Sequence, residues 1–102
     1  MEDPRGQERF LARTSLASIK SYEEGRFPFQ RLVADLKSRI SAMKSFADPQ
    51  WADELWSSWF RLEIVNAVTI DQHREPDQDE AREINEALGV LRLMLTEHPE
   101  EG

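Results

Sequence analysis

Apolar residues recur along most of this chain at the three- and four-residue spacing of an α-helix, and no segment shows the alternation typical of a strand. The longest such segment is PQWADELWSSWFRLEIVNAVTID, residues 49–71, which contains all three tryptophans. Asp48 followed by Pro49 is a typical N-cap and first helical residue. We therefore predict a helix over 49–71 as the core element of the fold, in contact with every other helix.

The two sides of this central helix differ in polarity when residues are spaced at about 100°. One half should be buried, and it contains Trp51, Ala52, Leu55, Trp56, Trp59, Phe60, Leu62, Ala67 and Ile70. Glu63 and Asn66 fall inside this apolar half, whereas Ile64, Val65 and Val68 fall on the polar half. The end of the helix is thus apolar nearly all round, which indicates that either neighbouring helices or a partner cover it.

Three further helices are predicted from the same periodicity. The first covers residues 7–24 and ends at Gly25, and the second starts at Phe27-Pro28 and ends near Phe46. The fourth follows the D-x-x-E capping box of Asp77 and Glu80 and runs to about residue 96. Gly89 lies inside it, which predicts a close helix crossing at that point.

Four helices with short connections are typical of a compact antiparallel four-helix bundle, so the predicted fold class is all-α. We expect one helical domain over residues 7–98, with 1–6 and 99–102 as flexible tails.

Charge is distributed unevenly along the chain, whose formal net charge is −7. Residues 1–44 hold nine Lys/Arg and six Asp/Glu, whereas residues 45–102 hold four Arg and fourteen Asp/Glu. An acidic half of this kind argues against binding to nucleic acid and favours a protein partner with a basic surface. The alternative is that the acidic residues serve only solubility.

The composition also narrows the class of protein. There are no cysteines, no apolar run approaches the roughly 18 residues of a membrane span, and no signal peptide is visible, so we expect a cytoplasmic protein without membrane contact. No catalytic, phosphate-binding or metal-binding motif is present. Asp71, His73 and Glu75 alternate, but a solvated loop is the better interpretation than a metal site. We therefore predict a non-enzymatic protein without a cofactor.

Two surfaces are candidates for partner binding. The first is an acidic patch made of Asp71, Glu75, Asp77, Asp79, Glu80 and Glu83. The second is an apolar face of the central helix, made of Ile64, Val65 and Val68 with Glu63 and Trp51 beside it, which would also suit a homodimer.

Glu63 has two interpretations. It is either a core glutamate that ties helices together through Arg31, Arg39, Tyr22 or Arg92, or a carboxylate at the edge of a partner-binding groove. Trp56 and Trp59 are expected in the core, and Trp51 is expected to be partly exposed.

Residues 22–71 carry a further pattern, YEEGRFPFQRLVADL followed by WADELWSSWFRLEIVNAVTID. It resembles a group of short bacterial helical proteins with a Tyr-x-x-Gly turn, a Leu-Val-x-Asp-Leu helix and a Trp-rich helix that ends near Leu-Glu. Some small helical proteins of this kind are immunity partners of bacterial toxins in colicin-like or contact-dependent inhibition systems. The resemblance implies an acidic protein that neutralises a toxin domain by direct binding, with no catalytic residue. The alternative function is a structural protein that self-associates through the C-terminal half of the central helix.

Overall fold

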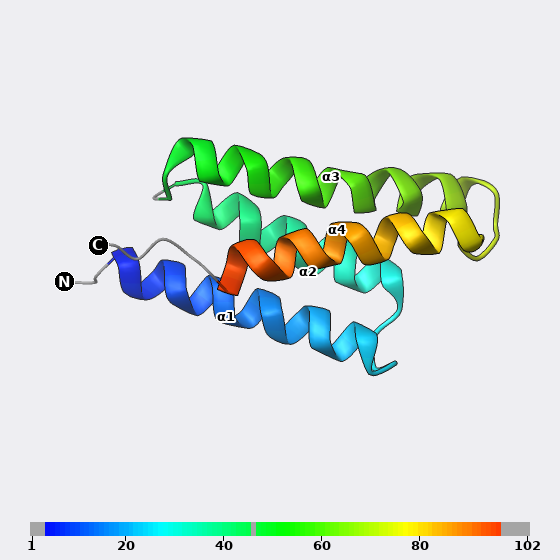
Figure 1. Cartoon of the computed structure of the whole chain (residues 1–102). Coiled ribbons are helices and arrows are strands. Elements are labelled where there is room, and N and C mark those ends of the chain that lie inside the picture. Colours follow the sequence, from blue (N-terminus) through cyan, green and yellow to red (C-terminus); the bar gives the residue numbers. More distant parts are fainter. Residues whose placement is uncertain (1–3, 46, 97–102) are drawn as a thin grey trace.

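The chain folds into four helices that run back and forth along one axis (Figure 1). The computed structural model describes residues 4–45 and 47–96. The helices are α1 (Pro4–Glu23), α2 (Phe29–Met43), α3 (Pro49–Asp71) and α4 (Gln78–Thr96). The predicted all-α four-helix bundle is confirmed.

The start of α3 and the start of α4 follow from their capping residues. The Asp48 carboxylate accepts a hydrogen bond from the Trp51 N–H at 3.0 Å. Before α4, the Glu80 N–H donates to Asp77 Oδ1 at 2.8 Å, and the Asp77 N–H donates to Glu80 Oε1 at 3.0 Å. Both predicted caps are confirmed, and the second is a complete capping box.

The ends of α1 and α3 share one geometry. Gly25 adopts a φ of 81°, and the Arg26 N–H reaches back to the Ser21 carbonyl at 2.9 Å. His73 adopts a φ of 51°, and the Arg74 N–H reaches back to the Thr69 carbonyl at 3.0 Å. Both are Schellman-type ends with a left-handed residue just beyond the helix, a position that glycine fills without strain and histidine does not.

Two helix boundaries differ from the prediction. Helix α1 begins at Pro4, inside the segment expected to be a tail, because proline is compatible with the first turn of a helix. Helix α2 is shorter than expected and covers Phe29–Met43, with Pro28 as its N-cap. Other parts of the prediction lie outside the described residues. They are the tail positions 1–3 and 99–102, the end of the domain at 97–98, and the expected end of the second helix at Phe46.

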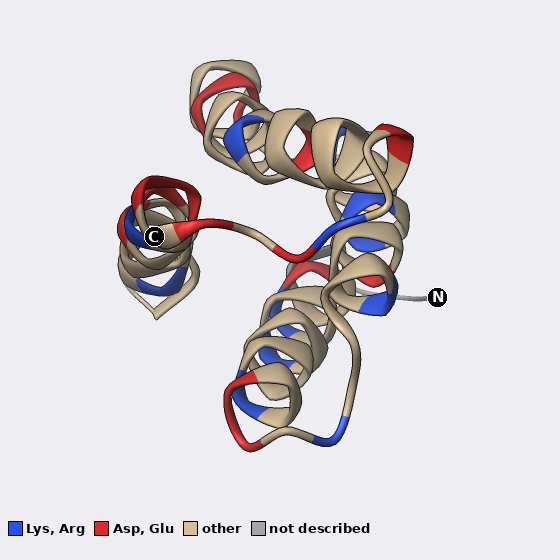
Figure 2. Ribbon diagram, turned by 90° about the vertical axis from the view of Figure 1, so that its right-hand side faces the viewer, with Lys and Arg blue, Asp and Glu red and all other residues tan. Residues whose placement is uncertain are grey.

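The four helices pack in the ring order α1–α2–α3–α4, and α4 closes the ring against α1. The prediction that α3 contacts every other helix is wrong: over residues 4–45 and 47–96, α3 and α1 approach nowhere within 8 Å between Cα atoms. Helices α1 and α3 occupy opposite corners of the bundle, as Figure 2 shows with α3 at the top and α1 at the bottom. Only two neighbours therefore cover α3, and its remaining surface faces outward.

The core lies between the four inward faces and is centred on Trp59, which is 2% exposed. Its indole Nε1–H donates to the Val33 carbonyl at 3.0 Å, which joins α3 to α2. The Trp56 ring packs 4.6 Å from the Trp59 ring between centroids, and Trp51 also packs against the core while remaining half-exposed. The prediction for Trp59 is confirmed, and Trp56 belongs to the margin of the core.

Several positions were misjudged from the periodicity. Phe60, Ala67 and Ile70 were placed on the buried half of α3 but are exposed, because the two neighbours of α3 cover a narrower arc than half of the helix. Gly89 does not mark a close crossing, since a Cβ added there would meet no atom within 4 Å. Within the described chain, no helix combines the length and the apolar character needed to cross a membrane.

Candidate binding surfaces

The predicted acidic patch lies at the end of the bundle where the loop from α3 enters α4 (Figure 2). Arg74 forms a two-pronged ion pair with Glu80, at 2.6 Å and 2.9 Å. Asp79 pairs with Arg82 at 3.4 Å. A carboxylate held in this way is less available to a partner than its sequence position suggests.

Arg61 neutralises the next acidic pair along α4. Its Nε donates to Glu83 at 2.6 Å and its Nη2 donates to Glu86 at 3.2 Å, so that one guanidinium joins α3 to α4. The hydrogen bond from Arg61 lowers the pKa of Glu83. The hydrogen bonds from Arg74 and from the Asp77 backbone lower the pKa of Glu80 to about 2.

The six residues of the predicted patch thus divide into two groups. Asp79, Glu80 and Glu83 are paired within the chain, and Asp77 caps α4. Asp71 and Glu75 are exposed and form no ion pair with any residue that the structure describes. The sequence located the acidic residues but not the arginines that neutralise half of them.

The second predicted surface exists in altered form on the outward side of α3. Ile64 is 51% exposed, and Phe60, one turn earlier, is 48% exposed. Ala67 continues the same line of the helix and is also exposed. We call Phe60, Ile64 and Ala67 the outer α3 face.

The predicted members of this surface are placed differently. Val65 is buried in the core, so its assignment to an interface is wrong; it lies on the side of α3 that faces the bundle. Val68, Glu63 and Trp51 are half-buried at the margins of the helix. Phe60 was missed because the helical periodicity placed it among the tryptophans.

Glu63 does not tie the helices together as proposed. Arg31 lies 3.8 Å from Asp35, Arg39 donates to Ser18 at 2.8 Å, and Arg92 pairs with Glu23. None of the four candidate partners, Tyr22 included, hydrogen-bonds Glu63 within the described chain. This placement favours the interpretation of Glu63 as a carboxylate at the edge of an exposed surface.

A hollow of about 560 Å³ lies where the start of α2 meets the end of α3 and its loop. Asn66 lines it, and none of the described residues forms a hydrogen bond with the buried Asn66 Oδ1. His73, Arg74 and Glu75 line the loop side. Nearby, burial raises the pKa of Tyr22, and the carboxylates of Glu23 and Glu75 raise it further.

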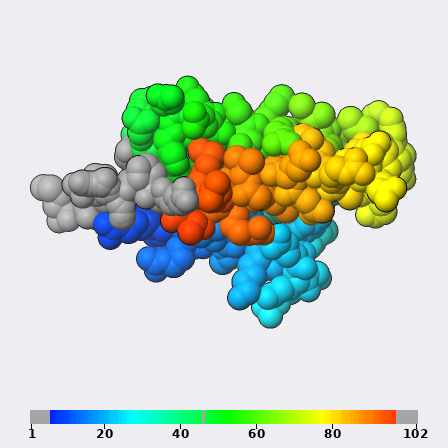
Figure 3. Space-filling view, viewed as in Figure 1, coloured from blue at the N-terminus to red at the C-terminus, as the bar shows by residue number. Residues whose placement is uncertain are grey.

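A second, more open hollow of about 760 Å³ follows the seam between the first half of α3 and the second half of α4. Figure 3 shows these two segments side by side, α3 in green and the end of α4 in orange. It is lined by Gln50, Asp53, Glu54, Ser57, Ser58, Val90 and Met94. We call it the α3–α4 groove.

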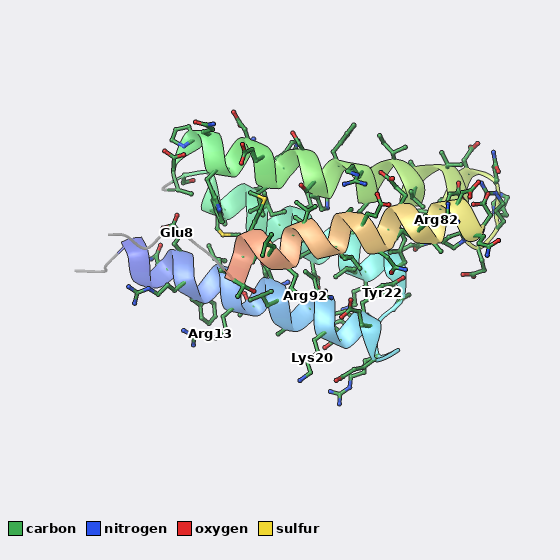
Figure 4. All side chains as sticks on the ribbon, in the orientation of Figure 1. Glu8, Arg13, Lys20, Tyr22, Arg82 and Arg92 are labelled. Carbon is green, nitrogen blue, oxygen red and sulfur yellow. The ribbon has the colours of Figure 1, made fainter. Side chains whose placement is uncertain are left out.

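The basic residues lie mainly on the other hairpin. Arg13 and Lys20 project from α1 away from the bundle, and Arg92 lies between α4 and α1 (Figure 4). On α2, Arg31 packs over the Phe27 ring at 4.0 Å. The α1–α2 side is therefore the basic side of the molecule, and the α3–α4 side is the acidic side.

Among the side chains described, no group of three or more His, Asp or Glu is placed to hold a metal ion. Comparisons of this chain with protein-family models, with curated proteins and with solved structures give no match. The resemblance to toxin-immunity proteins therefore stays a prediction.

Proposed function

We propose that this protein is a non-enzymatic binding module that recognises a partner protein with a basic surface through the outer α3 face. The observation that carries the proposal is the exposure of Phe60 and Ile64, two large apolar side chains one turn apart on the helix that also supplies Trp59 to the core. Burial of such side chains against a partner contributes roughly 1–2 kcal/mol each.

The charges along the same side of α3 favour a basic partner. Asp53 lies seven residues before Phe60, and Asp71 lies seven residues after Ile64. Seven residues are about two helical turns, so both carboxylates fall near the line of the apolar pair and frame it. Both are exposed.

The positions of Asp53 and Asp71 also argue against a homodimer through the outer α3 face. If two copies packed along their outer α3 faces around Phe60 and Ile64, an antiparallel arrangement would bring Asp53 near Asp71 of the other copy, and a parallel one would align like residues. Both arrangements place acidic groups together, which is unfavourable. A partner with basic residues at either side of an apolar strip avoids this repulsion.

Toxin neutralisation is the more specific form of this proposal. An acidic helical protein that covers a basic toxin domain would need an apolar contact surface framed by carboxylates, as α3 presents. The partner would then be a toxin domain from the same organism, and binding alone would inhibit it.

The test compares variants of the tagged protein for capture of binding partners from the native host. The Phe60→Ser/Ile64→Ser double variant removes the apolar pair. Phe10→Ser is the matched control, because Phe10 is 59% exposed but lies on α1. Circular dichroism first establishes that both variants remain folded.

The proposal predicts a partner that the wild type and Phe10→Ser retain and that the double variant loses, and the purified partner should show the same order of affinity. Retention of the partner by the double variant would place recognition elsewhere. Sedimentation velocity of the protein alone tests the homodimer: a dimer at micromolar concentration that the double variant abolishes would favour self-association.

A further inference from the structure

We infer that the α3–α4 groove holds one face of a basic amphipathic helix supplied by the partner. This inference rests on the proposed function and assigns the partner a secondary structure and a charge pattern. The helix expected in the groove has apolar residues along one side and Lys or Arg residues at the edges of that side.

The floor of the groove is apolar and accessible. Val90 is 39% exposed and Met94 is half-buried, and both line the groove from α4. They are four residues apart and therefore lie one above the other on the same side of the helix. A methionine at such a position adapts to apolar side chains of differing shape.

The rim of the groove is acidic on the α3 side. Asp53 and Glu54 line it, and both are exposed. None of the described residues that line the groove is Lys or Arg, so neither carboxylate is matched there by a basic side chain. The Arg61 guanidinium, which joins α3 to α4, is already held by Glu83 and Glu86. The electrostatic match for this rim is a basic segment.

The dimensions of the groove suit a helix. Its α3 wall extends from Gln50 to Ser58, which is roughly 12 Å or two turns at 1.5 Å per residue. Two turns of a docking helix carry the i, i+3, i+4 and i+7 positions that anchor helix-in-groove complexes. Asp53 and Ser57 border both this groove and the outer α3 face, so one partner can cover the two surfaces together.

The test uses a fluorescein-labelled peptide of about 18 residues, about five turns of helix, built from leucine at i, i+3, i+4 and i+7 spacing and lysine elsewhere. A peptide with glutamate in place of lysine serves as its charge control. Binding to the full-length protein is measured by fluorescence anisotropy at physiological salt, where long-range attraction is screened beyond about 8 Å.

Two matched pairs of variants distinguish binding in the groove from electrostatic attraction to the protein as a whole. Val90→Ser removes an apolar side chain from the floor, and Leu93→Ser removes a more exposed one, 57% exposed, that does not line the groove. Asp53→Asn/Glu54→Gln removes two rim carboxylates, and Glu24→Gln/Asp35→Asn removes the same amount of charge on the α1–α2 side, away from both surfaces.

The inference predicts that the lysine peptide binds and the glutamate peptide does not. Val90→Ser and Asp53→Asn/Glu54→Gln should each weaken binding about fivefold or more, equivalent to about 1 kcal/mol, while both controls stay within about twofold. If the two charge variants weaken peptide binding equally, the peptide is attracted by the overall negative charge and not by the groove, which would overturn the inference. Preference for the glutamate peptide, or a dimer of the protein alone that Asp53→Asn/Glu54→Gln dissociates, would also overturn it.

A failure of this inference and a failure of the proposed function can be distinguished. If Phe60→Ser/Ile64→Ser abolishes capture of the native partner while the groove variants bind the peptide like wild type, the binding module stands and the groove assignment falls. If the groove pairs separate as predicted while Phe60→Ser/Ile64→Ser retains the partner, the outer α3 face is the part that fails.

Discussion

At the scale of single residues, Trp59 stabilises the fold by filling the core and by linking two helices. It fills the centre of the bundle, and its indole N–H donates to the Val33 carbonyl on the neighbouring helix α2. Its ring also contacts Trp56, and the Lys44 ammonium lies 4.7 Å from the centre of the Trp56 ring. Trp59 therefore joins α2 to α3 by packing and by a hydrogen bond.

Trp59→Ala should lower the free energy of unfolding by about 3–5 kcal/mol, because it empties a large buried site. Trp59→Phe keeps most of the volume and loses the hydrogen bond to Val33, so it should cost only about 1–2 kcal/mol. Urea unfolding followed by circular dichroism gives both values. A cost below about 1 kcal/mol for the alanine variant would contradict the central position of Trp59.

His73→Gly should raise the free energy of unfolding by about 0.5–1 kcal/mol, because His73 holds a left-handed backbone that glycine adopts without strain. Gln72→Gly is the control. Gln72 has a φ of −94°, so glycine there gains no relief of strain and adds freedom to the unfolded chain. It also removes the hydrogen bond that Gln72 Oε1 accepts from Arg74 Nε at 2.6 Å, so the substitution should destabilise the protein by at least about 0.5–1 kcal/mol. If both substitutions destabilise the protein, the His73 side chain stabilises the fold by more than the strain of its left-handed backbone costs.

Single residues with local signals were predictable from the sequence, and residues whose setting depends on neighbours were not. Asp48, Gly25 and the Asp77–Glu80 box act on the backbone within a few residues, so the sequence identifies their roles. Phe60 and Val65 depend on which arc of α3 the other helices cover. Periodicity gives the apolar side of a helix only to within about a residue, and α3 is apolar over most of its circumference near its end.

At the scale of elements, arginines fasten the α3–α4 hairpin. Arg74 in the loop holds Glu80 on α4, and Arg61 on α3 holds Glu83 and Glu86. The partners of Arg61 are 22 and 25 residues away in the chain. Such pairs follow from the register between two helices, which the sequence pattern does not give, so the sequence overstated the charge available on the acidic patch.

The pairing of Glu80 makes stability depend on pH in a defined direction. Its pKa is about 2 in the folded protein, against an ordinary value of 4.5. Because the folded pKa is the lower one, the stabilisation is fully present above pH 4.5 and is lost as the pH falls toward about 2. Glu83, whose pKa is also lowered, acts in the same direction.

Glu80→Gln should therefore lower stability at neutral pH and flatten its decline between pH 4.5 and about 2. Glutamine can still accept the hydrogen bond from the Asp77 N–H, so the substitution removes the charge at position 80 and keeps this part of the cap. Urea unfolding across this pH range gives both curves. Parallel curves for the wild type and the variant would show that the Arg74–Glu80 pair does not persist in solution.

At the scale of the whole molecule, the bundle is elongated, with extents of 46 × 26 × 20 Å, and its charge is divided between its two hairpins. Residues 1–44 carry nine of the thirteen Lys/Arg, and residues 45–102 carry fourteen of the twenty Asp/Glu. The outer α3 face and the α3–α4 groove both lie on the acidic side. A basic partner would thus be attracted to the side that presents the exposed apolar residues.

The central claim is that a partner covers the outward side of α3, and isoleucine-methyl NMR of the protein with its purified partner tests it most directly. Ile64 and Ile70 are exposed on α3, whereas Ile19, Ile40 and Ile84 are buried in the core and report on the fold itself. The account predicts that the Ile64 methyl signal shifts or broadens in proportion to bound partner, with Ile40 and Ile84 nearly unchanged. Saturated binding that leaves the Ile64 signal in place would contradict it.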